Sequence, residues 1–165
     1  MRVLRLTWFL IFLILISSCN SKLSSYPYKA EYLEAQDFRL KSIYGREVSL
    51  GEYLGEKPVL ILFWTTWCPY CRSALIDLKE KREYLSDKGI EVLAINIGES
   101  PQKVINLVER IGFNFEVLLD RDSKVSDSYG LLGVPTCIII NRLGRIVFNG
   151  NRFSIAKLKE LNLEE

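Results

Sequence analysis

A continuous apolar run at residues 59–64, Val-Leu-Ile-Leu-Phe-Trp, constrains the fold of this chain most strongly. Polar and apolar residues do not alternate in it, so the run indicates a strand that is covered on both faces. Strands of this kind lie in the middle of parallel or mixed sheets with helices packed on both sides. A second run at residues 90–97 predicts a neighbouring strand of the same type.

Strands and helices alternate along the rest of the chain. The spacing of Leu75, Leu78 and Leu85 predicts one helix over residues 68–85. The further expected elements are a hairpin within residues 38–50, a helix from Ser100-Pro101 to Gly112, a strand at 115–119, a short helix at 123–129, a hairpin of strands 136–140 and 145–149, and a last helix capped by Ser154. The expected fold class is therefore α/β, with a mixed sheet flanked by helices and an N-terminal β-hairpin.

Composition excludes several classes of function. The length of 165 residues corresponds to about one domain. The chain has no histidine, which removes histidine-based triads and the common zinc and haem sites. Beyond the first 18 residues, basic and acidic residues are equal in number. A chain balanced in this way lacks the basic surface that a nucleic-acid partner requires.

The N-terminus has the pattern of an export signal. Arg2 and Arg5 precede an apolar stretch at residues 6–16, which is shorter than the roughly 20 residues of an ordinary membrane-spanning helix. The segment Ile16-Ser17-Ser18-Cys19 resembles a bacterial lipobox, which implies that Cys19 carries lipid and becomes the first residue. An ordinary secretory signal and an uncleaved short anchor are the alternatives.

These features predict three regions and a location. We expect a lipoprotein signal peptide at 1–18, a lipidated tether at 19–35 and the folded domain at 36–165. The expected location is outside the cytoplasm, where the lipid anchor holds the protein on a bacterial membrane.

Two cysteines, Cys68 and Cys71, lie where the first buried strand passes into its helix. The first N–H groups of a helix lack partners within the helix and favour negative charge, so a thiolate at Cys68 is stabilised there. Cys71 lies about one turn further on and can resolve a mixed disulfide at Cys68. Pro69 suits the first helical turn, and Trp67 indicates a docking surface. A structural disulfide and a metal site, for which this chain offers too few ligands, are the alternatives.

A second motif, Gly133-Val134-Pro135-Thr136, lies just before the last buried strand. Together with Phe-Trp-x-x-Trp-Cys-x-x-Cys it resembles the thioredoxin fold. The segments at 37–40, 45–50 and 57–58 resemble more narrowly the TlpA/ResA branch, which consists of membrane-tethered thiol–disulfide oxidoreductases. The resemblance extends over residues 36–162. It implies a thioredoxin-like domain with a cis peptide bond between Val134 and Pro135.

The resemblance also implies a function, an extracytoplasmic thiol–disulfide oxidoreductase with Cys68 as nucleophile and Cys71 as resolving thiol. Pro135 shapes the docking loop, and the substrate-binding residues are Trp67, Pro69, Tyr70 and Val134. No external cofactor and no metal are needed. The implied substrates are cysteine-containing exported proteins, with apocytochrome c among the candidates, and a membrane thiol–disulfide protein is the electron donor or acceptor.

Two other functions remain open. Thr65-x-x-Cys68 resembles the signature of a thiol peroxidase, but Ile61 stands where that family has a proline. The second alternative is a binding lipoprotein of the same fold without catalytic activity.

The sequence departs from its relatives near the resolving thiol. Leu62 stands where thioredoxin has an aspartate, and Ala74 where TlpA/ResA-like proteins commonly have a glutamate. Either acid would accept the proton of Cys71. We therefore expect Cys71 to deprotonate less readily than in those relatives. Cys137 is interpreted as a small buried hydrophobic residue, with a third redox thiol as the alternative.

Overall fold

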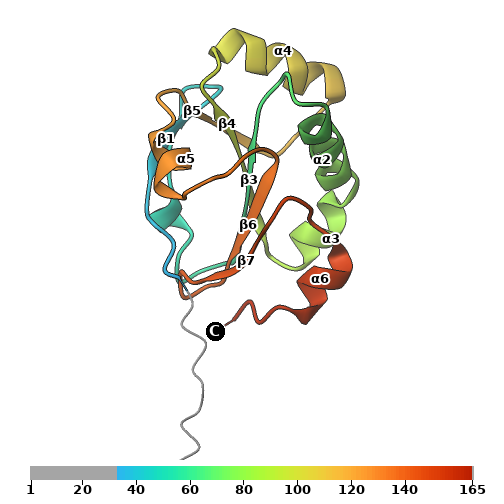
Figure 1. The fold of residues 1–165 in the computed structure, drawn as a ribbon. Coiled ribbons are helices and arrows are strands. Elements are labelled where there is room, and N and C mark those ends of the chain that lie inside the picture. The colour runs from blue at the N-terminus through green and yellow to red at the C-terminus, as the bar shows by residue number, and fades with distance from the viewer. Residues whose placement is uncertain (1–32, 165) are drawn as a thin grey trace, which may run out of the picture. The chain divides into compact units, whose positions relative to one another are not determined.

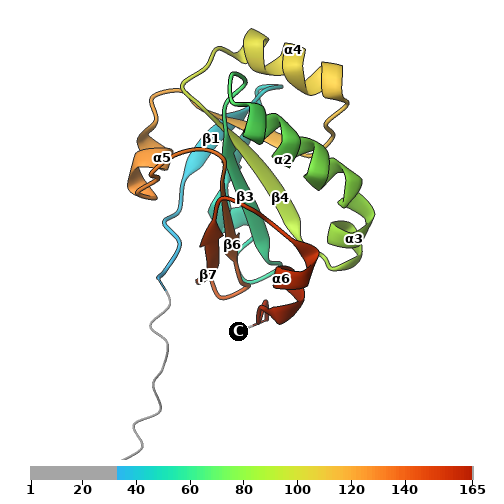
Figure 2. The ribbon, with the colours of Figure 1, turned by 45° about the vertical axis from the view of Figure 1, so that its right-hand side comes forward.

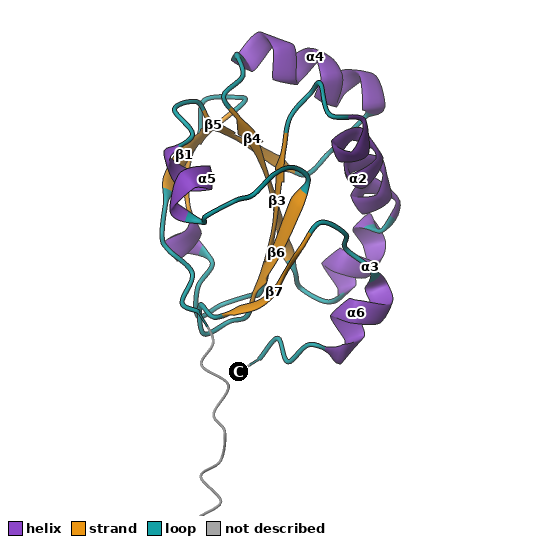
Figure 3. Cartoon of the chain, viewed as in Figure 1, coloured by secondary structure: helices purple, strands orange, loops and turns teal. Residues whose placement is uncertain are grey.

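The computed structural model describes residues 33–164, which form a seven-stranded mixed sheet with helices on both faces (Figures 1 and 3). The expected signal peptide, Cys19 and most of the expected tether lie outside the described residues. Within the described part of the chain, no helix is long and apolar enough to cross a membrane.

The sheet has the order β2-β1-β5-β4-β3-β6-β7, with β3, β4 and β5 parallel and the other neighbours antiparallel. Its strands are β1 (Arg39–Ser42), β2 (Glu47–Ser49), β3 (Val59–Trp64), β4 (Glu91–Ile97), β5 (Glu116–Asp120), β6 (Thr136–Ile140) and β7 (Ile146–Gly150). The helices are η1 (Leu50–Glu52), α2 (Pro69–Glu80), α3 (Arg82–Asp87), α4 (Pro101–Ile111), α5 (Lys124–Ser128) and α6 (Ile155–Glu160). The predicted fold class is confirmed.

The strand β3 lies at the centre of the hydrophobic core, and all six of its residues are buried. Leu60, Leu62 and Trp64 pack on the face that α2, α3, α4 and α6 cover. Val59, Ile61 and Phe63 pack on the opposite face, with η1 and α5. The apolar run therefore marks a strand that is covered on both sides, as predicted.

The connections explain which helices share a face (Figure 2). The chain steps from β3 to β4 to β5 in one direction across the sheet. Right-handed crossovers in one direction place α2, α3 and α4 on the same face. The chain then returns through α5 to β6, on the other side of β3. Because β6 is antiparallel to β3 and Phe63 pairs with Thr136, the end of β3 lies beside the start of β6.

Three local predictions need adjustment. The helix expected at 68–85 is broken at Lys81, which has φ −94° and ψ 9°, although no glycine or proline stands there. Ser100 precedes α4, but its side chain makes no capping hydrogen bond, whereas Ser154 accepts one from the Lys157 N–H. Residues 33–35, placed in the expected tether, hydrogen-bond with the turn between β6 and β7.

Candidate active site

Cys68 and Cys71 lie at the start of α2, as the sequence predicts. Cys68 is the N-cap residue and Pro69 the first helical residue, and the Cys71 N–H donates a hydrogen bond to Cys68 Sγ at 3.2 Å. Both cysteines are free thiols and both are buried, Cys68 with 4% of its surface exposed and Cys71 with none. A thiolate at Cys68 would be held by this N–H and by the helix dipole.

The loop before β6 faces Cys68 from a distant part of the chain. The Val134–Pro135 peptide bond is cis, as the resemblance implies. Cys68 Sγ lies 3.7 Å from the carbonyl oxygen of Val134, 66 residues away in sequence. Trp67 and Tyr70 are largely exposed, with 65% and 76% of their surfaces open to solvent. The structure thus places the predicted site residues around one point of the surface.

Cys71 has no carboxylate partner at either of the two positions that the sequence singles out. Leu62 is buried in the core, and Ala74 packs at its margin. Burial raises the pKa of the Cys71 thiol to about 12, and the hydrogen bond with the Cys68 side chain acts in the same direction. The acid nearest in sequence on α2, Asp77, forms an ion pair with Lys81. The high pKa agrees with the expectation that Cys71 deprotonates reluctantly.

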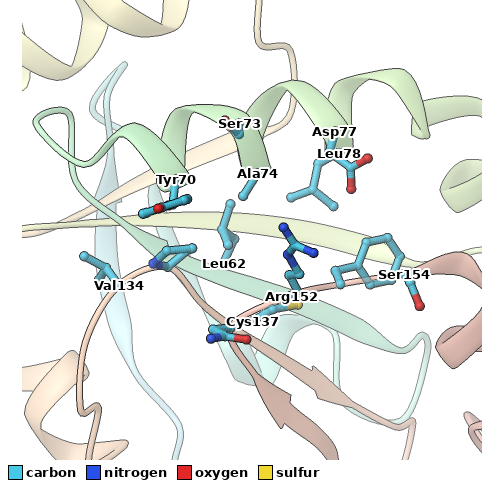
Figure 4. A pocket seen from close by; sticks show the side chains of 13 residues that line it. Leu62, Tyr70, Ser73, Ala74, Asp77, Leu78, Val134, Cys137, Arg152 and Ser154 are labelled. Atoms are coloured by element: carbon cyan, nitrogen blue, oxygen red, sulfur yellow. The ribbon is translucent and has the colours of Figure 1, made fainter.

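A groove of about 790 Å³ extends from the cis-proline along one side of α2 (Figure 4). Tyr70 and Asp77 line it from the helix, and Arg152 lies between the helix and the sheet. Cys137 also lines the groove, although only 1% of its surface is exposed, and burial raises the pKa of its thiol to about 12. Its burial agrees with the interpretation of Cys137 as a hydrophobic residue.

Glu99 is a residue that the sequence analysis missed. Its buried carboxylate accepts hydrogen bonds from the Thr66 N–H at 2.6 Å, the Thr66 hydroxyl at 2.7 Å and Asn96 Nδ2 at 2.8 Å. Lys103 Nζ forms an ion pair with it at 2.5 Å. Glu99 therefore joins the end of β4 to the segment that lies two residues before Cys68.

The hydrogen bonds to Glu99 stabilise the ionised form of its carboxyl group. Burial alone would raise the pKa of its carboxyl group, but the hydrogen bonds from Asn96, Lys103 and Thr66 outweigh this effect and lower it to about 2. Arg72 of α2 donates a hydrogen bond to the Thr66 carbonyl at 2.9 Å, so Thr66 is held by the helix as well as by Glu99. The parallel pairing of β3 with β4 brings these segments together, and that pairing is the signal that would have revealed Glu99.

This fold and site define a thioredoxin-like protein, with a cysteine pair at a helix start facing a cis-proline. The chain belongs to the AhpC/TSA family, whose family model matches residues 33–149.

Named relatives fit this assignment. Thiol-disulfide oxidoreductase ResA of Bacillus subtilis (strain 168) is 34% identical over 118 residues, which make up 72% of this chain and 65% of that protein. ResA of Geobacillus thermodenitrificans (strain NG80-2) is 36% identical over 112 residues, 68% of this chain and 64% of that protein. The chain therefore spans slightly less than two thirds of the length of these relatives.

A solved structure shows the same arrangement of elements. It is described as a candidate thiol:disulfide interchange protein DsbE from Chlorobium tepidum, with a TM-score of 0.70 and 26% identity. The match covers 78% of this chain and 92% of that one.

The role of Glu99 predicts a pH-dependent loss of stability. Replacing it in the variant Glu99→Gln should lower the free energy of unfolding by about 1–3 kcal/mol at pH 7, because a charged acceptor with buried donors is removed. Its pKa is lower in the folded protein than the ordinary 4.5, so this stabilisation is present above pH 4.5 and is lost as the pH falls towards 2. Urea unfolding of wild type and Glu99→Gln at pH 7, 5 and 3 measures the difference in their free energies of unfolding.

The exposed Glu109 of α4, the helix that follows Glu99 in the chain, provides the control. Glu109→Gln should change the unfolding free energy by less than about 0.5 kcal/mol at each pH. A difference between wild type and Glu99→Gln that stays constant from pH 7 to pH 3 would contradict the assignment.

Proposed function

We propose that this protein is a thiol–disulfide oxidoreductase in which Cys68 is the nucleophile and Cys71 the resolving thiol. The observation that carries the proposal is the position of Cys68 Sγ. It lies at the N-terminus of α2, accepts the Cys71 N–H at 3.2 Å and faces the Val134 carbonyl at 3.7 Å. The names of the ResA relatives support the same activity.

The reaction proceeds in two exchanges. The Cys68 thiolate attacks one sulfur of a substrate disulfide, which forms a mixed disulfide and releases the other substrate sulfur as a thiolate that takes up a proton. Cys71 then loses its proton and attacks Cys68 Sγ, and the second substrate sulfur leaves and is protonated. The substrate gains two electrons and two protons, and the Cys68–Cys71 pair becomes a disulfide. No cofactor or metal takes part.

The surface around Cys68 suits an extended polypeptide. The Val134 backbone precedes β6 and can pair with a substrate chain as an added strand. The exposed rings of Trp67 and Tyr70, which flank Cys68 and Pro69 in sequence, offer apolar contacts to such a chain. Cysteine-containing exported proteins are the proposed substrates, apocytochrome c among them, and a membrane thiol–disulfide protein exchanges electrons with the pair.

Trapping of the mixed disulfide tests the two assigned roles. The Cys71→Ser variant should accumulate reductant-sensitive complexes with a disulfide substrate such as insulin, because nothing resolves the bond at Cys68. Cys68→Ser should form no complex and reduce no insulin. Non-reducing electrophoresis and a turbidity assay measure both outcomes.

The Cys137→Ser variant is the matched control, since Cys137 is a buried thiol outside the pair. It should retain wild-type activity. Full insulin reduction by a Cys68→Ser, Cys71→Ser double variant would instead favour a protein whose function does not use these thiols. Rapid consumption of hydrogen peroxide with no insulin reduction would favour the thiol peroxidase.

The direction of exchange is proposed to be reduction of the substrate. Strong oxidants of this type owe their potential to a stabilised reduced form. In the reduced pair, burial keeps Cys71 protonated, so only Cys68, with the Cys71 N–H and the helix start, can stabilise the reduced form. We therefore expect a reduction potential at or below the roughly −270 mV of thioredoxin, measured by equilibration with a thiol buffer. A value near the roughly −120 mV of strong oxidants would reverse the proposed direction.

We further propose that the protein acts outside the cytoplasm as a lipoprotein anchored through Cys19. The basic, apolar and small-residue pattern of residues 1–19 supports this proposal. The mature chain should begin at Cys19 and carry a diacylglycerol group, and Cys19→Ala should abolish labelling by a palmitate analogue. Mass spectrometry of the membrane fraction measures the N-terminus. A mature N-terminus at another residue without acyl groups would contradict lipidation.

A further inference from the structure

The hydroxyl group of Thr65 is a buried polar group to which the proposed function gives no role. Thr65 directly follows β3, and only 5% of its surface is exposed. Among the described residues, its Oγ1 atom has no well-formed hydrogen bond. Buried hydroxyl groups nearly always have a partner, so an unpaired one needs an explanation. The neighbouring Thr66, by contrast, donates a hydrogen bond from its hydroxyl group to the Glu99 carboxylate at 2.7 Å.

The group within reach of Thr65 is the Cys71 thiol. Both the side chain and the backbone of Thr65 act on Cys71, and both lower the pKa of its thiol, against the larger effect of burial. Only a donor lowers the pKa of an acid in this way, so the groups involved are the hydroxyl and the N–H. A neutral thiol is a weak acceptor, whereas a thiolate accepts strongly. The hydroxyl therefore lacks a good partner only while Cys71 is protonated.

We propose that Thr65 is a catalytic residue whose hydroxyl group donates a hydrogen bond to the Cys71 sulfur as that sulfur ionises during resolution. This inference rests on the proposed function and deepens it. Thr65 takes no proton, so it is not a substitute base for the acids absent at Leu62 and Ala74. It stabilises the product of the deprotonation instead.

The step is balanced without any further reactant. In the mixed disulfide, the Cys71 S–H bond breaks and its proton passes to solvent. The Cys71 thiolate, held by Thr65, forms a bond with Cys68 Sγ, and the bond from Cys68 to the substrate sulfur breaks. The electron pair of that bond leaves with the substrate sulfur, which takes a proton from solvent. In this step Cys71 is oxidised and the second substrate sulfur is reduced, while Cys68 remains in a disulfide throughout.

Other titratable groups surround this site. Cys68 faces Cys71 from the start of α2 and raises the pKa of its thiol. On the groove side, the titratable and charged residues are Tyr70 and Asp77 of α2, Cys137 of β6 and Arg152 after β7. On the β4 side, Glu99 and Lys103 are paired with each other, and Arg72 donates to Thr66. The Thr65 variants below change none of these groups.

Two-phase release of thionitrobenzoate tests the proposal. In the full-length chain with Cys19→Ser, Cys68 attacks dithionitrobenzoate and releases one thionitrobenzoate, and Cys71 then releases the second. Thr65→Ser and Thr65→Ala leave nearly the same space and differ by one hydroxyl group. Thr65→Ala should slow the second release about tenfold at pH 7 and move its pH profile up by about one unit. Thr65→Ser keeps the hydroxyl group, so its second release should stay within about threefold of the wild-type rate. The tenfold slowing in Thr65→Ala corresponds to about 1.4 kcal/mol.

The first release is the internal control and should be the same in both variants. Equal second-phase rates in Thr65→Ser and Thr65→Ala would overturn the proposal. An equal slowing of both phases in Thr65→Ala would also overturn it, because it would show a structural role. Comparison of wild type with Thr65→Val, which keeps the volume, repeats the test if the smaller side chains disturb the fold. A wild-type chain that releases only one thionitrobenzoate would instead refute the proposed function itself.

Discussion

The antiparallel pairing of β3 with β6 is the interaction on which the candidate site depends. Phe63 lies opposite Thr136, so the chain leaving β3 and the chain entering β6 meet at one end of the sheet. Cys68 extends from the first and Val134 from the second. A slip of one residue in this register would turn every side chain of β6 to the other face. The 3.7 Å approach of the Cys68 sulfur to the Val134 carbonyl therefore depends on this register.

The buried carboxylate of Glu99 and the buried thiol of Cys71 have different roles in the site. The buried carboxylate of Glu99 is satisfied by Thr66, Asn96 and Lys103, so it holds the backbone before Cys68. Cys71 is buried, and this burial, together with the hydrogen bond with the Cys68 side chain, keeps the pKa of its thiol high. The backbone before Cys68 thus depends on Glu99, whereas the acidity of the resolving thiol depends on its burial and on Cys68 and Thr65.

Local patterns predicted the parts of the fold that local physics determines. The apolar run identified β3, Cys68 and Cys71 marked the start of α2, and the family resemblance indicated the cis bond before Pro135. The break at Lys81 escaped prediction because no residue there signals it. Glu99 escaped for another reason, since its partner Thr66 is 33 residues away and only the β3–β4 pairing joins them.

The small exposed surface of Cys68 limits the stage of folding at which a substrate can reach its sulfur. Only 4% of its surface is open, and the Val134 carbonyl stands beside the sulfur. A disulfide in a mobile, extended segment reaches so recessed an atom more readily than one set rigidly in the surface of a folded protein. On the proposed function, the protein competes with the folding of its own substrates. Its substrates on that basis are chains whose cysteines have not yet been enclosed by folding.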